Sequence, residues 1–174
     1  MKCDISKYFD SIDHSVLKRI IRKKIHSPGL LWLIDLIIDS HDKGNPIGNL
    51  TSQLFANVYL NELDHFIKDR LGTRCYIRYM DDFVILDTDK DRLFQLRSLI
   101  KEFLETELKL KLHPKKTEYS PVDRGIDFLG YVVFSDYILL RKSTVKRYIK
   151  KLRKKLRKLV NQEVLKELDR SFLA

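Results

Sequence analysis

Apolar residues recur along the whole chain with spacings that alternate between helical and strand-like. Helical spacing predicts helices over residues 13–24 and 30–39, from residue 51 or 52 to about 71, over 89–108, and from 143 onward. Asp13 is placed to cap the first of these helices. Short apolar and aromatic runs predict strands over residues 1–5, 74–79, 83–86, 109–112, 116–120, 127–134 and 137–140. Helices mixed with antiparallel hairpins indicate an α+β fold rather than a doubly wound sheet.

Acidic residues stand at the ends of two predicted strands. Asp4 ends the first strand, and Asp81 and Asp82 occupy the turn between residues 74–79 and 83–86. The stretch between them is long enough for their strands to become neighbours, so the three carboxylates are expected to converge. Like charges at one edge repel each other, and such a cluster is tolerated mainly when cations bind it. Hard oxygen ligands favour Mg²⁺, with Mn²⁺ as a substitute.

An Asp-Asp turn by itself is common in solvated hairpins and needs no metal. The chemical alternative is a pair of divalent ions about 3.5–4 Å apart, bridged by Asp4 and Asp81, that activates a hydroxyl and stabilises a leaving pyrophosphate. The turn alone does not decide between the two interpretations, so the rest of the chain has to be considered.

The net charge of +10 is unevenly distributed. Residues 1–140 hold 21 basic and 21 acidic side chains, whereas residues 141–158 carry 11 basic side chains and no acidic one. An apolar stripe runs through this basic segment at helical spacing, made up of Val145, Ile149, Leu152, Leu156, Leu159 and Val160. A solvated helix usually mixes charges of both signs, so the segment predicts a polyanionic partner, and nucleic acid before membrane.

Composition excludes several classes of protein. With 174 residues, 44% of them hydrophobic, the chain is long enough for one globular domain with a core. Its apolar runs fall short of the ~20 residues that cross a bilayer, and its first residues lack a secretory apolar region. The two cysteines form no disulfide framework. We therefore expect a cytoplasmic protein with no membrane partner.

Four ordered segments resemble the palm of reverse transcriptases. They are DISKYFD at residues 4–10, KGNPIGNLTSQLFANVYL at 43–60, YIRYMDD at 76–82 and FLGY at 128–131. The resemblance runs from residue 1 to the start of a thumb near residue 141. It implies a ferredoxin-like antiparallel sheet with helices packed on one face, followed by a basic thumb helix. It also implies RNA-directed DNA polymerase activity, in which two metal ions support nucleotidyl transfer to a primer 3′-hydroxyl.

The resemblance assigns roles residue by residue. Asp4, Asp81 and Asp82 match the catalytic, metal-binding aspartates. The nucleotide-binding positions would be Ile5, Phe9, Ile47, Gly48, Gln53, Lys115 and Lys116. The primer grip would be Phe128, Leu129, Gly130 and Tyr131. The basic positions expected to bind nucleic acid are Lys146, Arg147, Lys150, Lys151, Arg153, Lys154 and Lys155.

Three of these assignments have simpler alternatives. Phe9 matches the bulky position that excludes a ribose 2′-hydroxyl, but its spacing also suits a core aromatic residue. Either Lys115 or Lys116 resembles the lysine that protonates pyrophosphate, and a solvated basic turn would look the same. Ile47 also suits a packed aliphatic residue.

The residue at position 47 points to one group within the reverse transcriptases. Most reverse transcriptases have Gln before the glycine of this loop, whereas this chain has the aliphatic Ile47. The segment IGNLTSQ at residues 47–53 resembles the version found in the reverse transcriptases of diversity-generating retroelements. These enzymes copy a template-repeat RNA with low fidelity. Since Ile47 cannot hydrogen-bond near the templating pair, weaker selection of the correct nucleotide is expected. The resemblance implies a bacterial or phage gene, and it allows a basic accessory protein as a further partner beside the RNA template, DNA primer and deoxynucleoside triphosphates.

The resemblance divides the chain into a palm at residues 1–140 and the start of a thumb at 141–174. Its first motif begins at Asp4, so we expect the fingers that precede the palm in this family to be absent, which leaves open whether the chain is active alone. Two rival interpretations remain. One is a non-catalytic RNA-binding module on a ferredoxin-like sheet. The other is a group II intron maturase fragment, which would be expected to have Gln at position 47.

Overall fold

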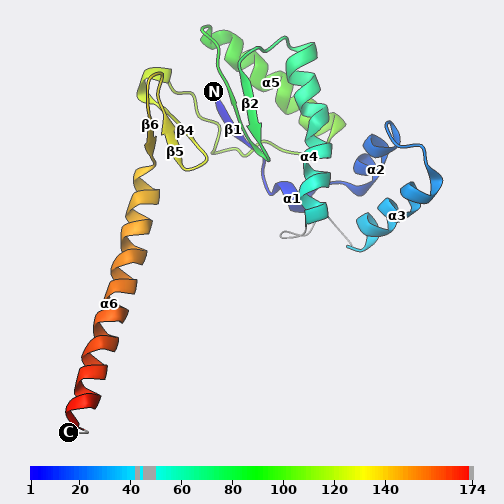
Figure 1. Cartoon of the computed structure of the whole chain (residues 1–174). Coiled ribbons are helices and arrows are strands. Elements are labelled where there is room, and N and C mark those ends of the chain that lie inside the picture. Colours follow the sequence, from blue (N-terminus) through cyan, green and yellow to red (C-terminus); the bar gives the residue numbers. More distant parts are fainter. Residues whose placement is uncertain (42–43, 45–49, 173–174) are drawn as a thin grey trace. The chain divides into compact units, whose positions relative to one another are not determined.

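The computed structural model describes residues 1–41, 44 and 50–172, and side chains up to residue 159. It contains both helices and antiparallel strands, as the α+β prediction requires (Figure 1). The elements, in order, are β1 (Lys2–Asp4), α1 (Tyr8–Ser11), α2 (His14–Arg22), α3 (Pro28–Asp39), α4 (Leu50–His65), η1 (Phe66–Arg70), β2 (Tyr76–Tyr79), β3 (Asp82–Ile85), α5 (Lys90–Glu107), η2 (Val122–Arg124), β4 (Ile126–Phe128), β5 (Tyr131–Val133), β6 (Ile138–Leu140) and α6 (Lys142–Phe172). The chain forms two compact units, Met1–Tyr119 and Ser120–Ala174.

The first unit is built on an antiparallel sheet with strand order β1-β3-β2. Cross-strand partners point to the same face of a sheet, so the register separates the strand residues into two groups. Cys3, Phe83 and Arg78 share one face, and Asp4, Asp82 and Tyr79 share the other. The first face carries the fully buried residues Phe83 and Ile85 and lies toward the helices.

Helix α4 is the centre of the core. It packs against both α2 and α5, and α3 packs on α2 (Figure 1). Its residues Tyr59, Leu60 and Leu63 have no exposed surface. The hydroxyl of Tyr59 donates a hydrogen bond of 2.6 Å to the carbonyl oxygen of Leu108, and Tyr8 donates one of 2.5 Å to that of Ala56. The helices are thereby held to α1 and to the end of α5 by satisfied buried hydroxyls.

Asp13 caps α2, as predicted. Its carboxylate accepts hydrogen bonds from the Val16 amide at 3.0 Å, from Lys109 Nζ at 2.7 Å, and from the Ser15 hydroxyl. Partial burial of Asp13 opposes its ionisation, but these hydrogen bonds outweigh it and hold the pKa of the carboxyl well below its ordinary value of 3.8. The ionised cap therefore ties the start of α2 to the residue that follows α5.

Two predicted strands are reduced to isolated bridges. Residues 109–112 and 116–120 run along the outer edge of β1, where Leu112 bridges to Ile5 and Glu118 bridges to Lys2. The two segments thus lie where a fourth strand would stand, but they form single bridges with residues of the β1 segment rather than a continuous ladder of hydrogen bonds. The predicted third helix also differs at its end, where α4 passes into the π-helical turn η1 before Gly72, whose φ is +60°.

The second unit consists of the sheet β4-β5-β6 and the helix α6. The single strand predicted over residues 127–134 is wrong, because Leu129 and Gly130 form a turn that separates β4 from β5. Both residues have positive φ, 51° and 88°, and such two-residue turns match the twist of antiparallel hairpins. Glycine is also required at Gly125, where φ is +79° and an added Cβ would lie 2.5 Å from Val132 Cγ1.

No helix within the described part of the chain is both long and apolar enough to span a bilayer. The strongly basic composition of α6 accounts for this in the longest helix.

Candidate active site

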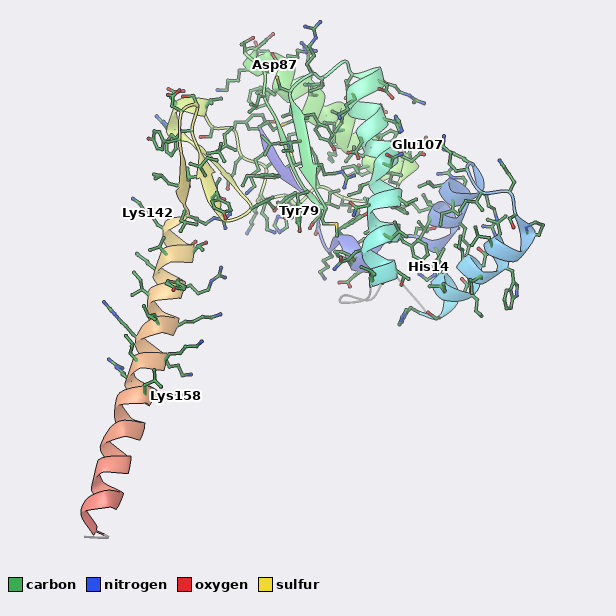
Figure 2. The ribbon with its side chains drawn as sticks, in the orientation of Figure 1. His14, Tyr79, Asp87, Glu107, Lys142 and Lys158 are labelled. Atoms are coloured by element: carbon green, nitrogen blue, oxygen red, sulfur yellow. The ribbon has the colours of Figure 1, made fainter. Side chains whose placement is uncertain are left out.

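Three carboxylates lie at one end of the sheet in the first unit. Asp4 is the last residue of β1 and Asp82 is the first residue of β3, and the two are direct cross-strand partners. Asp81 precedes Asp82 in the turn that connects β2 to β3. Tyr79, labelled in Figure 2, pairs with Asp82 and marks the same end of the hairpin. The antiparallel pairing of β1 with β3 therefore brings together residues that are more than 75 positions apart in sequence.

Ionisation of Asp81 is opposed by its surroundings. Asp4 is buried, with 8% of its surface exposed, and Asp81 and Asp82 are partly buried. Burial raises the pKa of the Asp81 carboxyl, and the negative charges of Asp4 and Asp82 raise it further, while Lys116 acts in the opposite direction. The ionised form of Asp81 is thus less favourable in the folded chain than in water.

Lys116 is the cation closest to Asp4 among the described contacts. Its Nζ donates to Asp4 Oδ2 at 2.9 Å, while the side chain remains 57% exposed. The Asp4 carbonyl accepts a 2.8 Å hydrogen bond from the His113 amide, which holds the 113–116 turn against β1. Lys115 is exposed, and its amide donates to His113 Nδ1 at 3.2 Å. Of the two lysines left open by the sequence, the structure places Lys116 at the carboxylates.

The residues expected to contact a nucleotide occupy different environments. Ile5 is 1% exposed and belongs to the core, so its backbone alone could reach a ligand. Phe9 lies in α1, is half-buried against the core, and packs beside Tyr8 with ring centroids 5.4 Å apart. Gln53 is exposed on the first turns of α4. Ile47 and Gly48 lie outside the described residues.

Sequence reasoning missed Arg78 and Asp64. Arg78 is the only charged residue of β2, and its guanidinium forms an ion pair with Asp64 of α4 and a 3.1 Å hydrogen bond with the carbonyl of Met80. Met80 is the residue that precedes Asp81. A basic residue in an otherwise aromatic and apolar strand was the signal that could have pointed to this contact, because such a residue requires a partner when buried.

The second unit presents the other predicted residues. Phe128 and Tyr131 are cross-strand partners on either side of the Leu129-Gly130 turn. Arg141, at the start of α6, pairs with Asp127 of β4, and its amide donates to the Gly130 carbonyl at 2.9 Å. The predicted primer-grip residues thus form a hairpin turn that is fixed to the base of α6.

The predicted basic residues are all exposed along α6 (Figure 2). A shallow surface along one side of the helix includes two cations that the sequence assignment left out, Arg157 and Lys158, and is lined by Lys146, Ile149, Lys150, Arg153, Lys154, Arg157 and Lys158. We call these seven residues the basic face. Its spacing of three and four positions aligns the positive charges over about three helical turns.

Comparison with known proteins identifies the family. The family described as "Reverse transcriptase (RNA-dependent DNA polymerase)" matches residues 1–133, which include all three carboxylates and the hairpin turn at Gly130. The chain belongs to the reverse transcriptase family. It is also 28% identical to "Protein YkfC" of Escherichia coli K12, over 74% of this chain and 45% of that protein.

A second relative is a yeast protein. The chain is 26% identical to the "Putative COX1/OXI3 intron 2 protein" of Saccharomyces cerevisiae S288c, over 40% of this chain and 10% of that protein. This reverse transcriptase chain therefore spans less than half the length of these two curated relatives.

Reverse transcriptases use Mg²⁺, and the donor set at the sheet end fits a hard divalent cation. Asp4, Asp81 and Asp82 supply carboxylate oxygens only, and their mutual repulsion is relieved by positive charge. Among the described residues, no three His, Cys, Asp or Glu side chains are gathered around one point as in a preformed metal site. Lys116 instead provides the positive charge at Asp4.

We expect Asp81→Asn to stabilise the chain in the absence of divalent cations. Because burial and the charges of Asp4 and Asp82 raise the pKa of Asp81, its ionised form is less favourable in the folded than in the unfolded chain. Because Asp81 is only partly buried and solvent screens part of the repulsion, removing this charge should raise the free energy of unfolding by about 0.5 kcal/mol, or Tm by roughly 1–2 °C. Thermal unfolding at neutral pH in EDTA measures this, with exposed Glu105→Gln as the control. An unchanged or lower Tm would show that carboxylate repulsion does not strain the fold.

Proposed function

We propose that this chain carries the palm of an RNA-directed DNA polymerase, which transfers a deoxynucleotide to a primer 3′-hydroxyl. The observation that carries the proposal is the convergence of Asp4, Asp81 and Asp82 at one end of the β1-β3-β2 sheet in a member of the reverse transcriptase family. Asp4 and Asp82 lie on the face of the sheet opposite the buried Phe83, and Asp81 lies in the adjoining turn.

Asp4 and Asp81 would hold two Mg²⁺ ions, or Mn²⁺ as a substitute, and Asp82 would complete the acidic cluster. Bound there, the ions would supply activation of the 3′-hydroxyl and stabilisation of the leaving pyrophosphate. Lys116 is placed to hold a proton near the same site, since its Nζ lies 2.9 Å from Asp4 Oδ2. Hydrogen bonding to Asp4 raises the pKa of Lys116, so the ammonium form is favoured while the pair is intact.

Phe9, Gln53, Ile47 and Gly48 would contact the incoming nucleotide and template, with the backbone of Ile5. The aromatic ring of Phe9 follows Asp4 through a short connection, which suits a position under the sugar. The Phe128–Tyr131 hairpin would contact the primer.

The second unit would bind the template-primer duplex through the basic face of α6. We retain the division into a palm at residues 1–140 and a thumb start at 141–174 as a functional proposal, with the β4-β5-β6 sheet counted in the palm. The cluster of exposed cations in the second unit supports phosphate contacts, and these carry affinity without sequence information.

Two origins are compatible with the chain. The IGNLTSQ segment supports a diversity-generating retroelement, in which the partners would include a template-repeat RNA and a basic accessory protein. The similarity to a yeast intron 2 protein supports an intron-encoded reverse transcriptase instead. Residue 47 separates the two proposals because the first requires that Ile47 lower the fidelity of copying.

Primer extension tests the polymerase proposal. The wild-type chain should extend a DNA primer on an RNA template with Mg²⁺ or Mn²⁺, and Asp81→Ala should lower incorporation by at least about 100-fold, because direct ligands matter more than their supporting partners. Glu105→Gln should retain activity. If the folded wild-type chain incorporates no nucleotide with either ion, the polymerase proposal fails for this chain, and metal-independent duplex binding would favour an RNA-binding module.

Salt dependence tests the role of α6. Duplex binding by the wild-type chain should weaken steeply as salt rises, because phosphate contacts release counterions. Changing Lys150, Arg153 and Lys154 together to Gln should reduce the slope of log K against log salt by about 2–3, at about 0.9 for each lost contact. Lys24, Lys68 and Lys101, which are exposed in the first unit, changed to Gln together form the control. Equal slopes for the two triple variants would contradict the assignment of the basic face.

Fidelity tests the proposed origin. Ile47→Gln should lower misincorporation opposite template adenine, because Gln adds a hydrogen-bonding group near the templating pair. Sequencing the products made by the wild type and the variant on one RNA template measures the error spectrum at each base. Identical spectra would overturn the retroelement proposal and leave the intron-encoded alternative.

A further inference from the structure

The turn that carries Asp81 has an unfavourable backbone conformation. Met80, immediately before Asp81, has a φ of +53°. Side chains other than glycine adopt this left-handed region at a cost in free energy, and the conformation persists where surrounding contacts enforce it. Since β2 ends at Tyr79 and β3 begins at Asp82, Met80 and Asp81 are the whole connection, and the backbone angles of Met80 determine where Asp81 lies relative to Asp82 and Asp4.

Arg78 supplies the contact that enforces the turn. Its Nη1 donates a 3.1 Å hydrogen bond to the Met80 carbonyl. The same guanidinium donates through Nε and Nη2 to the two carboxylate oxygens of Asp64, at 2.7 and 2.5 Å. Nη1 also lies 3.3 Å from Asn57 Oδ1. With 9% of its side chain exposed, Arg78 is largely buried, and its contacts with Asp64 are charge-assisted hydrogen bonds, which are stronger than neutral ones.

The partners of Arg78 lie on the central buried helix of the first unit. Asp64 and Asn57 belong to α4, the helix that carries the fully buried Tyr59, Leu60 and Leu63. Asp64 also accepts a 2.6 Å hydrogen bond from the Tyr76 hydroxyl, which fixes its orientation. Asn57 Nδ2 donates to the Gln53 carbonyl at 3.2 Å. The contacts therefore connect the helix that carries Gln53 to the turn that carries Asp81.

We propose that Arg78 is a positioning residue, which ties the Met80-Asp81 turn to the buried helix α4 and so sets Asp81 against Asp4 and Asp82. The inference rests on the proposed function for its catalytic meaning. Arg78 lies on the opposite face of the sheet from Asp4 and Asp82, so it acts through the backbone and does not touch the substrate. Lysine cannot replace it, because a single ammonium cannot bind both oxygens of Asp64 and reach the Met80 carbonyl.

Methionine provides a direct probe of the turn. The chain has two methionines, Met1 and Met80, so labelling with ¹³C-methyl methionine yields one NMR signal from the turn and one internal reference from the buried N-terminus. In Arg78→Lys we expect the Met80 signal to shift and broaden while the Met1 signal stays in place. The affinity for Mn²⁺ should fall by about 10- to 100-fold, as when a supporting partner of a ligand is removed. Arg74→Lys, at an exposed position before β2, is the matched control.

A second variant separates positioning from general stability. In the Arg78→Lys background, Met80→Gly should restore part of the Mn²⁺ affinity, because glycine adopts positive φ without a steric cost. A residue that only stabilises the fold would not be rescued in this way. If Arg78→Lys fails to fold, Asn57→Ala, which removes one exposed contact to Arg78, should still shift the Met80 signal.

The outcomes distinguish this inference from the proposed function. An unchanged Met80 signal in Arg78→Lys, or in Asn57→Ala if the first variant does not fold, overturns the positioning role. A Met80 signal that depends on Arg78 supports the role even if the wild type binds no Mn²⁺, a result that would count against the proposed function alone. Loss of Mn²⁺ affinity without rescue by Met80→Gly would overturn the route through the Met80 backbone.

Discussion

The antiparallel pairing of β1 with β3 is the constraint on which the site depends, because it places Asp4 directly opposite Asp82. Two carboxylates in register, with a third in the adjoining turn, repel one another, and burial strengthens the effect. This repulsion opposes the strand pairing, so other contacts have to stabilise it. The hydrophobic face of the same strands, with Cys3, Phe83 and Ile85 buried beneath the helices, stabilises the pairing that the acidic face opposes.

Lys116 and Arg78 contact this part of the sheet from opposite faces. Lys116 reaches Asp4 directly from an exposed turn, where an incoming ligand can displace it. Arg78 is enclosed between the sheet and α4, and its bidentate contact with Asp64 holds it there. An exposed lysine is readily rearranged, whereas a buried arginine bound by a carboxylate is costly to move. The positive charge at Asp4 can therefore rearrange, whereas Arg78 stays in contact with the backbone of the turn that carries Asp81.

Local pattern predicted much of the fold. The helical periodicities of α2, α3 and α5, the cap at Asp13 and a turn at Asp81 follow from residues close together in sequence. Predictions failed where the outcome depended on distant partners. Residues 109–112 and 116–120 have strand-like composition, but they meet only the short β1 and form single bridges. Leu129 was assigned to a strand because its left-handed conformation has no local sequence signal, whereas Gly130 beside it offered one.

The candidate site shows the same division between local and distant information. The three aspartates were predicted by their positions at strand ends together with a family resemblance. The contact between Arg78 and Asp64 was not, because Asp64 comes 14 residues earlier on another element.

The charged residues are unevenly distributed along the chain. The first 140 residues are neutral overall, and the excess of positive charge lies in residues 141–158. The carboxylate cluster and the basic face thus belong to different units of the chain, and among the described residues of the first unit the cation that contacts Asp4 is Lys116.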